Sequence, residues 1–355
     1  MSGHHRKAFS YYQLELFTKK MLVLTGTSGR LGGGVLQNIL QKGLMPPSEL
    51  VISAFNVDGV PAAAKDAGII IQHGDYTKPE TLLHAFRGAD ALFLVTYPSV
   101  GEERFEHHKA AIDAAKASGI RHVIYTSLSF GGITGEESIA GVMQAHVRSV
   151  KYLKASGLIY TIVREASYAD IWNIFCGFVQ LDASHDDVDF VVPGDGASTW
   201  ADRDELAEAT ASIVANWVSS IVLLKVAVSM LITLQKQYEN KSILLSGPRA
   251  TSISEIATLL QTHTGRQVNV KIVSPEEAII YHMRNPALPQ DGGKFLRNWA
   301  TWFKAMSLGE ASVVDPALEQ ILGRKPKGIQ EMAEELFVVQ QPTGLDTKEF
   351  GDYAK

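Results

Sequence analysis

Residues 21–36 read MLVLTGTSGRLGGGVL, an apolar run that leads into Gly26-x-x-Gly29-x-x-Gly32 and then into an apolar-periodic segment. This order predicts a strand, a tight turn and a helix. Gly26 lets the chain leave the strand, Gly29 lets the backbone approach a diphosphate, and Gly32 lets the helix pack closely on the sheet. The unpaired N–H groups and the helix dipole then favour an anion. The stretch therefore predicts a dinucleotide-binding turn, with a ligand-free tight turn as the alternative.

Composition indicates a soluble globular protein. The chain has 355 residues, of which 46% are hydrophobic and 20% charged, and its formal net charge is −5. This length suits one large or two ordinary domains. The negative charge and the lack of a basic cluster argue against nucleic acid as a partner. Cys176 is the only cysteine, which excludes an internal disulfide and favours a reducing compartment, so we expect a cytoplasmic protein.

Three segments do not follow the pattern of the rest. We expect residues 1–20 to form a disordered extension and residues 341–355 a tail. Residues 217–234, WVSSIVLLKVAVSMLITL, are apolar over the length of a membrane span but contain Lys225 near the middle. A cation at that depth is costly, which disfavours a span. A packed helix and an insertion that the fold tolerates poorly remain as alternatives.

Strand-like and helical patterns alternate through the first half of the chain. Strands are expected at 21–25, 50–54, 69–72, 91–96, 121–127 and 159–164, with helices at 31–42, 60–66, 79–87, 103–118 and 139–156 between them. Such alternation predicts parallel strands joined by helical crossovers, covered by helices on both faces. The fold class is therefore α/β, with a doubly wound parallel Rossmann sheet over residues 21–164. Ligands of such sheets lie beyond the carboxyl ends of the strands.

After Arg164 the strict alternation stops. Shorter elements are expected, including strands at Ser242–Ser246 and Gln267–Val273 and a helix at Ser252–Thr264. Residues 165–340 are interpreted as a smaller α/β substrate lobe that covers the cofactor and carries the apolar insertion.

Five stretches resemble the NmrA-like branch of the atypical short-chain dehydrogenases/reductases, including its quinone-oxidoreductase-like and fungal secondary-metabolism members. They are LTGTSGRLG (24–32), GDYTKPETLLHAFRGADALFLVT (74–96), HHKAAIDAAKASGIRHVIYTSL (107–128), QAHVRSVKYLKASGLIYTIVRE (144–165) and LSGPRATSISEIATLL (245–260). The resemblance implies a Rossmann-type domain, NADP(H) or NAD(H) as cofactor, and either reductase activity or a regulatory role that depends on the cofactor.

The resemblance also implies where cofactor contacts lie. Residues expected to line the diphosphate are Thr25, Gly26, Thr27, Ser28, Gly29, Arg30, Leu31 and Gly32. Asp75 and Tyr76 are placed beside the adenine. Thr96, Tyr97, Pro98, Ser127 and Leu128 are placed near the nicotinamide ribose, whose hydroxyls Lys151 is expected to hold. Each has a structural alternative: Asp75 could only cap a turn, Tyr97 could pack beneath its loop, and Lys151 could be a solvated charge.

The chain departs from the common catalytic pattern of these enzymes. A tyrosine four residues before the lysine normally supplies the proton, but Val147 stands at that position before Lys151, and no tyrosine in the chain has a lysine four residues after it. The chemistry would therefore depend on hydride transfer to an activated acceptor such as a quinone or enone. His146 and Tyr168 are candidates for contact with the substrate, and a structural histidine is the alternative for His146.

Cofactor choice depends on the residues at the end of the second strand. A carboxylate there would select NAD and an arginine NADP, whereas this chain has Ser53-Ala-Phe-Asn56. Without a carboxylate at the tip, and with Ser53 and Asn56 as hydrogen-bond donors, the sequence favours NADP(H), with NAD(H) as the alternative.

Two functional hypotheses follow. The first is an NAD(P)H-dependent oxidoreductase that transfers hydride to a small conjugated carbonyl compound or a quinone. The second is a regulatory protein that binds the dinucleotide without turnover and signals to a protein partner. A metal site is not expected, because the adjacent His107 and His108 diverge on a helix and no Cys or His spacing suggests zinc.

Overall fold

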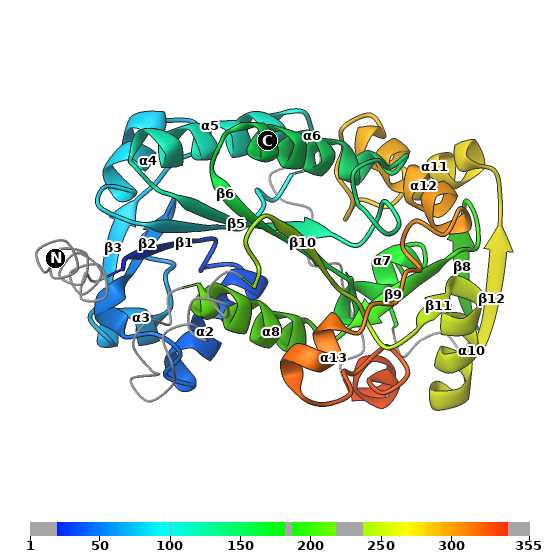
Figure 1. The fold of residues 1–355 in the computed structure, drawn as a ribbon. Helices are drawn as coiled ribbons and strands as arrows, with labels where there is room; N and C mark the ends of the chain where they lie inside the picture. The colour runs from blue at the N-terminus through cyan, green and yellow to red at the C-terminus, as the bar shows by residue number, and fades with distance from the viewer. Residues whose placement is uncertain (1–19, 100, 182–186, 218–236, 340–355) are drawn as a thin grey trace, which may run out of the picture.

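The computed structural model describes residues 20–99, 101–181, 187–217 and 237–339. Its centre is a parallel sheet of seven strands in the order β10-β6-β5-β4-β1-β2-β3, seen edge-on in Figure 1. These strands are β1 (Leu22–Thr25), β2 (Leu50–Ala54), β3 (Ile70–His73), β4 (Ala91–Leu94), β5 (His122–Leu128), β6 (Ile159–Glu165) and β10 (Lys241–Leu245). The predicted doubly wound α/β sheet is confirmed.

Helices cover both faces of this sheet (Figure 1). On one face lie α4 (Pro79–Ala85), α5 (Glu103–Ala117) and α6 (Gly141–Ala155), and on the other lie α2 (Arg30–Gln41), α3 (Ala62–Asp66), α8 (Arg203–Asn216) and α13 (Ala317–Leu322). Alternate side chains of each strand enter opposite cores. Leu22 and Leu24 pack towards α2 and α8, whereas Val23 packs towards α4 and α5. Both faces of the strands are therefore apolar, as the sequence pattern indicates.

The remaining elements form the lobe at the right of Figure 1. It contains α7 (Trp172–Phe175), α10 (Ile253–Thr264), α11 (Pro275–His282), α12 (Lys294–Ser307), β7 (Ser167–Tyr168), β8 (Asp187–Val192), β9 (Ala197–Ala201), β11 (Ala250–Ser252) and β12 (Gln267–Ile272). Two small sheets, β11-β9-β7 and β12-β8, belong to it. Ser252 and Ser274 close capping boxes at the starts of α10 and α11.

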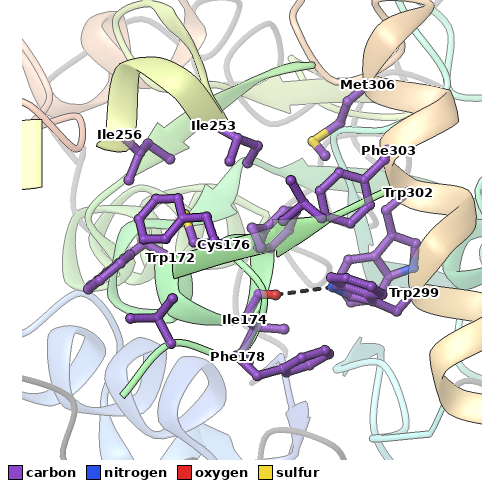
Figure 2. Packing of buried hydrophobic residues seen from close by; sticks show 14 of the residues in the cluster. Trp172, Ile174, Cys176, Phe178, Ile253, Ile256, Trp299, Trp302, Phe303 and Met306 are labelled. Atoms are coloured by element: carbon purple, nitrogen blue, oxygen red, sulfur yellow. Dashed lines mark hydrogen bonds between the residues drawn. The ribbon is translucent and has the colours of Figure 1, made fainter. Parts of the chain in front are cut away.

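An aromatic core holds the lobe together (Figure 2). Trp299 of α12 is fully buried and its indole N–H donates to the carbonyl oxygen of Ile174 at 3.1 Å. Its ring also packs against Phe178 and Phe303 at centroid distances of 4.9 and 4.8 Å. Cys176 lies in the same core and burial raises the pKa of its thiol, which fits a packing role.

The main sheet draws on residues from both sides of the boundary expected at residue 164. Lys241–Leu245, which the sequence assigned to the lobe, forms β10 and pairs in parallel with β6. Helix α8 also returns to the sheet, where it packs along α2. Of the apolar stretch 217–234, only Trp217 is among the described residues. Residues 1–19 of the extension expected over 1–20, and the tail over 341–355, also lie outside them.

The strand order reverses between β1 and β4. From β1 the chain adds β2 and β3 on one side, then crosses over and adds β4, β5 and β6 on the other. The crevice outside the carboxyl ends of β1 and β4 is therefore where a doubly wound sheet binds its ligand. The glycine-rich turn follows β1 at this point.

Candidate functional site

The turn between β1 and α2 leaves no space for side chains at two of its glycines. Gly26 has a φ of +67°, and a Cβ atom there would lie 2.7 Å from the Cβ atom of Val95, which follows β4. A Cβ atom on Gly32 would lie 2.3 Å from the carbonyl oxygen of Gly26. The N–H of Gly29 donates to that same carbonyl group at 3.0 Å, directly before α2 begins. The packing of this turn therefore requires glycine at both positions.

The start of α2 is suited to an anion. Its N-cap residue, Gly29, has no side chain to accept the first N–H groups, and the first turn of α2 contains no acidic residue. These N–H groups and the helix dipole favour negative charge. Ser28 is exposed beside them, while Leu31 and Thr27 are buried. The turn therefore fits the diphosphate of a dinucleotide, because it combines open N–H donors with a backbone that a ligand can approach closely.

Arg30, the first residue of α2, forms an ion pair with Asp170. The same carboxylate lies 3.1 Å from the guanidinium of Arg203, the first residue of α8. Arg203 also stacks over the ring of Tyr168, 4.2 Å from its centroid. These contacts hold the segment after β6 beside the glycine turn. They place Tyr168 at the edge of the sheet, where the sequence analysis expected a substrate contact.

The end of β2 presents one of its two candidate residues to solvent. Ser53 is 4% exposed, and a Cβ atom on Gly74 would lie 2.0 Å from its hydroxyl oxygen, so this hydroxyl faces β3. Asn56 is exposed, and its side-chain oxygen accepts from the N–H of Gly59 at 3.2 Å. The amide nitrogen of Asn56 is a hydrogen-bond donor at this exposed tip.

Asp75, after β3, closes a local turn. It is 5% exposed and accepts hydrogen bonds from the N–H and the hydroxyl of Thr77 at 2.9 and 2.7 Å. Burial alone would raise its pKa, but the bonds from Thr77 and the nearby Lys78 lower it below the ordinary value. The carboxylate of Asp75 is thus used within the turn. Any contact with adenine would come from other atoms of this segment.

An aromatic group forms where β3 and β4 end. The ring of Tyr97 lies 5.8 Å from that of Tyr76 and 4.3 Å from that of His107, measured between centroids. All three residues are half-buried, and Pro98 beside them is exposed. The backbone of Thr96 and Tyr97 is fixed from below, because the N–H of Tyr97 donates to Nε2 of His108 at 2.9 Å.

The loop after β5 is held by one buried arginine. Arg164 of β6 is 2% exposed and donates to the carbonyl oxygens of Leu128, Ser129, Phe130, Gly132 and Ile133. Burial lowers the pKa of its guanidinium to about 10. The candidate residue Ser127 lies at the end of β5 and is 3% exposed. Arg164 therefore fixes the backbone around Ser127 and Leu128. The hydrogen bonds of its guanidinium are used within this loop.

Glu165 ends β6 and is fully enclosed. Its two carboxyl oxygens accept from the hydroxyl groups of Tyr168 at 2.7 Å and Thr210 at 3.2 Å. Burial raises its pKa to about 7, although these bonds and the charge of Arg203 act in the opposite direction. A carboxyl group that titrates near neutrality at the edge of the sheet is unusual for a structural residue.

Two of the predicted catalytic residues, His146 and Lys151, lie on α6. His146 has no exposed surface, and its ring nitrogens contact the hydroxyl of Tyr125 at 2.8 Å and the guanidinium of Arg104 at 3.2 Å. It therefore does not face a substrate, which corrects that expectation in favour of the structural alternative. Lys151 is exposed on α6, which begins at Gly141. It lies about 15 Å along α6 from the start of the helix, and its contact with the ribose stays a prediction.

Four residues that the structure brings to the site were not predicted from the sequence: His108, Glu165, Asp170 and Arg203. Glu165 carried a usable signal, since it is a carboxylate directly at the end of a predicted buried strand. Asp170 and Arg203 carried none, because their pairing with Arg30 joins segments that are distant in sequence. The predicted tyrosines and the glycine turn do come together at one edge.

The described part of the chain has neither a candidate metal site nor a candidate membrane span. No group of three or more His, Cys, Asp or Glu side chains there could hold a metal ion. Within the same residues, no helix is both long and apolar enough to cross a membrane. A hollow of about 710 Å³ lies between β8, β12 and α11, lined by Phe178, Asp189 and Arg266 among others. It shares no residue with the glycine turn or with the strand ends of the large sheet.

Comparison with known proteins agrees with this geometry. Residues 26–174 match the family described as NAD(P)H-binding. The chain is 28% identical over 322 residues to an NmrA-like family domain-containing oxidoreductase of Aspergillus flavus, covering 89% of this chain and 94% of the relative. It is 27% identical over 255 residues to quinone oxidoreductase 2 of Escherichia coli, covering 72% of this chain and 78% of the relative.

A solved structure shows the same fold. The NADPH-dependent quinone oxidoreductase of Escherichia coli was crystallised with NADPH, and it superposes on this chain with a TM-score of 0.72 at 24% identity. The superposition covers 89% of this chain and 100% of the other. The sheet, the glycine turn and these matches define an NAD(P)H-binding protein with a Rossmann-type fold. Within that class, the chain is similar to an NmrA-like family domain-containing oxidoreductase. The prediction of a nicotinamide dinucleotide as cofactor is confirmed.

Proposed function

We propose that this protein is an NADPH-dependent reductase that transfers hydride to a small conjugated carbonyl compound or a quinone. The observation that carries the proposal is the glycine turn at the switch point, where backbone atoms and an open helix start face the crevice between β1 and β4. The relatives named as oxidoreductases support it. A setting in fungal secondary metabolism is part of the proposal, because the family resemblance includes such members.

In this proposal the N–H groups at the start of α2 hold the diphosphate, and Arg30 lies beside them in its ion pair with Asp170. The backbone of Thr96 and Tyr97, and that of Ser127, border the nicotinamide. When bound, the nicotinamide supplies the hydride, and the protein contributes position and exclusion of water. Tyr168 is the candidate for contact with the substrate, since it lies after β6 at the same edge of the sheet, and its hydroxyl is held by Glu165.

NADPH is proposed over NADH because of the tip of β2. The segment Ala54-Phe-Asn56 contains no carboxylate to repel a 2′-phosphate, and Phe55 is 72% exposed, so the tip is accessible. The Asn56 amide can donate to a phosphate. The E. coli quinone oxidoreductase of the same fold was crystallised with NADPH, which supports this choice.

The alternative is a regulator that binds the dinucleotide and acts through a protein partner. It is favoured by the sequence before Lys151, because Val147 and not a tyrosine stands four residues ahead of it. The usual pair of tyrosine and lysine is thus not assembled at the edge of the sheet. A protein without this acid would bind the cofactor and still fail to turn over a carbonyl that needs a proton.

Titration of the full chain with NADPH and NADH by calorimetry, followed by a quinone panel, tests the proposal. We expect NADPH to bind at least about tenfold more tightly than NADH, a difference of about 1.4 kcal/mol. We also expect NADPH oxidation that depends on the quinone. Binding without oxidation of NADPH by any acceptor would favour the regulator, and folded protein that binds neither nucleotide would refute both functions.

A further inference from the structure

Five polar side chains form a buried cluster beneath the crevice, between β5, α5 and α6. They are Arg104, His108, Tyr125, His146 and Ser149, and none is more than 7% exposed. Buried polar groups destabilise a fold unless their hydrogen bonds are satisfied, so such a cluster needs an explanation. We call it the histidine cluster.

The bonds of His108 determine its tautomer. Its Nε2 lies 2.9 Å from the backbone nitrogen of Tyr97, which can only donate, so Nε2 accepts. Its Nδ1 lies 2.8 Å from the Ser149 hydroxyl oxygen, and that hydroxyl donates to the carbonyl oxygen of Ala145 at 2.7 Å. Nδ1 must therefore carry the proton and donate to Ser149. Protonation of Nε2 would turn the bond to Tyr97 into a repulsive contact between two N–H groups.

Arg104, His146 and Tyr125 form the other half of the histidine cluster and hold His108 neutral and in place. The guanidinium of Arg104 donates to Nε2 of His146 at 3.2 Å, so Nδ1 of His146 carries a proton and donates to the Tyr125 hydroxyl at 2.8 Å. The Tyr125 hydroxyl in turn lies 3.2 Å from Nδ1 of His108. Burial, and then the charge of Arg104, lower the pKa of both histidines well below the ordinary value.

The His108 ring reaches the crevice through the backbone that follows β4. It bonds to the N–H of Tyr97, and its Nε2 is also 3.2 Å from the hydroxyl of Thr96. The N–H of Thr96 donates to the hydroxyl of Thr126 in β5 at 2.9 Å. Because β4 borders the switch point, this backbone faces the ligand on one side and the histidine cluster on the other.

We propose that His108, kept neutral with the proton on Nδ1, is a positioning residue that fixes the Thr96–Tyr97 backbone for NADPH binding. The inference rests on the proposed function, because it requires the dinucleotide to occupy this crevice. An imidazole acceptor below Tyr97 holds the peptide in one orientation before the ligand arrives, and a preorganised site binds more tightly. His108 itself touches no ligand.

Two substitutions of His108 test the roles of its two ring nitrogens separately. Glutamine can place an acceptor near the position of Nε2 and keep the bond to Tyr97, whereas asparagine reaches only towards Ser149. His122 provides the matched control, because it is 2% exposed, lies at the opposite end of β5 and bonds to the Thr161 hydroxyl at 2.8 Å. His122→Asn thus disturbs a buried histidine away from the crevice.

The NADPH dissociation constant is measured by calorimetry and the melting temperature by circular dichroism for each variant. We expect His108→Asn to weaken NADPH binding by roughly tenfold, and His108→Gln and His122→Asn to stay within about 1.5-fold of wild type. Both asparagine variants should lower the melting temperature. Equal loss of affinity in His108→Asn and His122→Asn, or none in His108→Asn, would overturn the inference while the wild type still binds NADPH.

Ser149→Ala provides a second variant if His108→Asn does not fold. It retains the ring and removes the acceptor that fixes the tautomer, and we expect NADPH binding about threefold weaker than in the wild type. In wild-type protein, nitrogen NMR should show a proton on Nδ1 of His108 and none on Nε2 between pH 6 and pH 8. A proton on Nε2, or affinity unchanged by Ser149→Ala, would contradict the proposal. Wild-type protein that does not bind NADPH would overturn both the inference and the proposed function.

Discussion

Replacing Glu165 with glutamine removes a buried ionisable group from the end of β6. Glu165 is 1% exposed and accepts hydrogen bonds from Tyr168 and Thr210. Glutamine has the same shape, its oxygen can accept one of these bonds, and its amide can donate to the other hydroxyl oxygen. The substitution therefore removes the titration of this site and keeps its packing.

The expected magnitude follows from the pKa of Glu165, which burial raises from 4.5 to about 7. The folded state binds this proton more tightly than the unfolded state. The stabilisation that Glu165 provides is therefore present in full at pH values below its pKa in the unfolded state. It is lost as the pH rises through the folded pKa. At about 1.36 kcal/mol per pKa unit, the wild type should lose roughly 2.5 kcal/mol of unfolding free energy from this group between pH 5 and pH 8.

Urea unfolding at pH 5 and pH 8 measures this effect. The difference in unfolding free energy between the two conditions should be about 2.5 kcal/mol smaller in Glu165→Gln than in wild type. Glu208→Gln is the control, because hydrogen bonds from Arg324 lower the pKa of Glu208 to about 2. Glu208 stays ionised at both pH values, so its removal should reduce stability equally at each. An identical pH dependence in Glu165→Gln and wild type would refute the assignment.

Three further outcomes are expected. Gly32→Ala puts a Cβ atom 2.3 Å from a carbonyl oxygen of the same turn, so NADPH affinity measured by calorimetry should fall at least about tenfold. In the control Gly33→Ala the nearest atom is 3.1 Å away; wild-type affinity in both variants would exclude this turn as the diphosphate site. Arg164→Met removes the donor to the loop after β5, and urea unfolding should show a loss of about 3–5 kcal/mol, with under 1 kcal/mol contradicting its role. Ser252→Ala removes a capping box of α10. We expect the free energy of unfolding to fall by about 1 kcal/mol and the NADPH affinity to stay unchanged. Weaker NADPH binding would contradict the separation of this helix from the site.

The alternation of strands and helices was predictable because each element carries its own periodicity. The predicted strand at 50–54 coincides with β2, and the one at 159–164 differs from β6 by a single residue. The place of Lys241–Leu245 was not predictable. This strand follows the apolar insertion, and its pairing with β6 depends on contacts with residues about 80 positions earlier in the chain.

In the candidate site, too, features made by one short segment could be predicted, and features that join distant segments could not. The glycine turn could be predicted because a diphosphate site of this kind consists of the backbone of one short segment. Asp170 could not, since its role depends on the charges of Arg30 and Arg203, which the fold brings together from two helices. His146 was misjudged because a resemblance in sequence carries no information on which way a buried helix face turns.

The polar side chains at the ends of β4 and β6 are already engaged by the protein itself. The Thr96 hydroxyl contacts His108, Arg164 is used by loop carbonyl groups, and Glu165 is held by Tyr168 and Thr210. Such a crevice offers a rigid backbone to a dinucleotide but few free acids to a substrate. Hydride transfer there would depend on proximity and on the electron affinity of the acceptor. Quinones, which accept hydride readily, fit this arrangement better than unactivated ketones, whose developing oxyanion needs a donor close by.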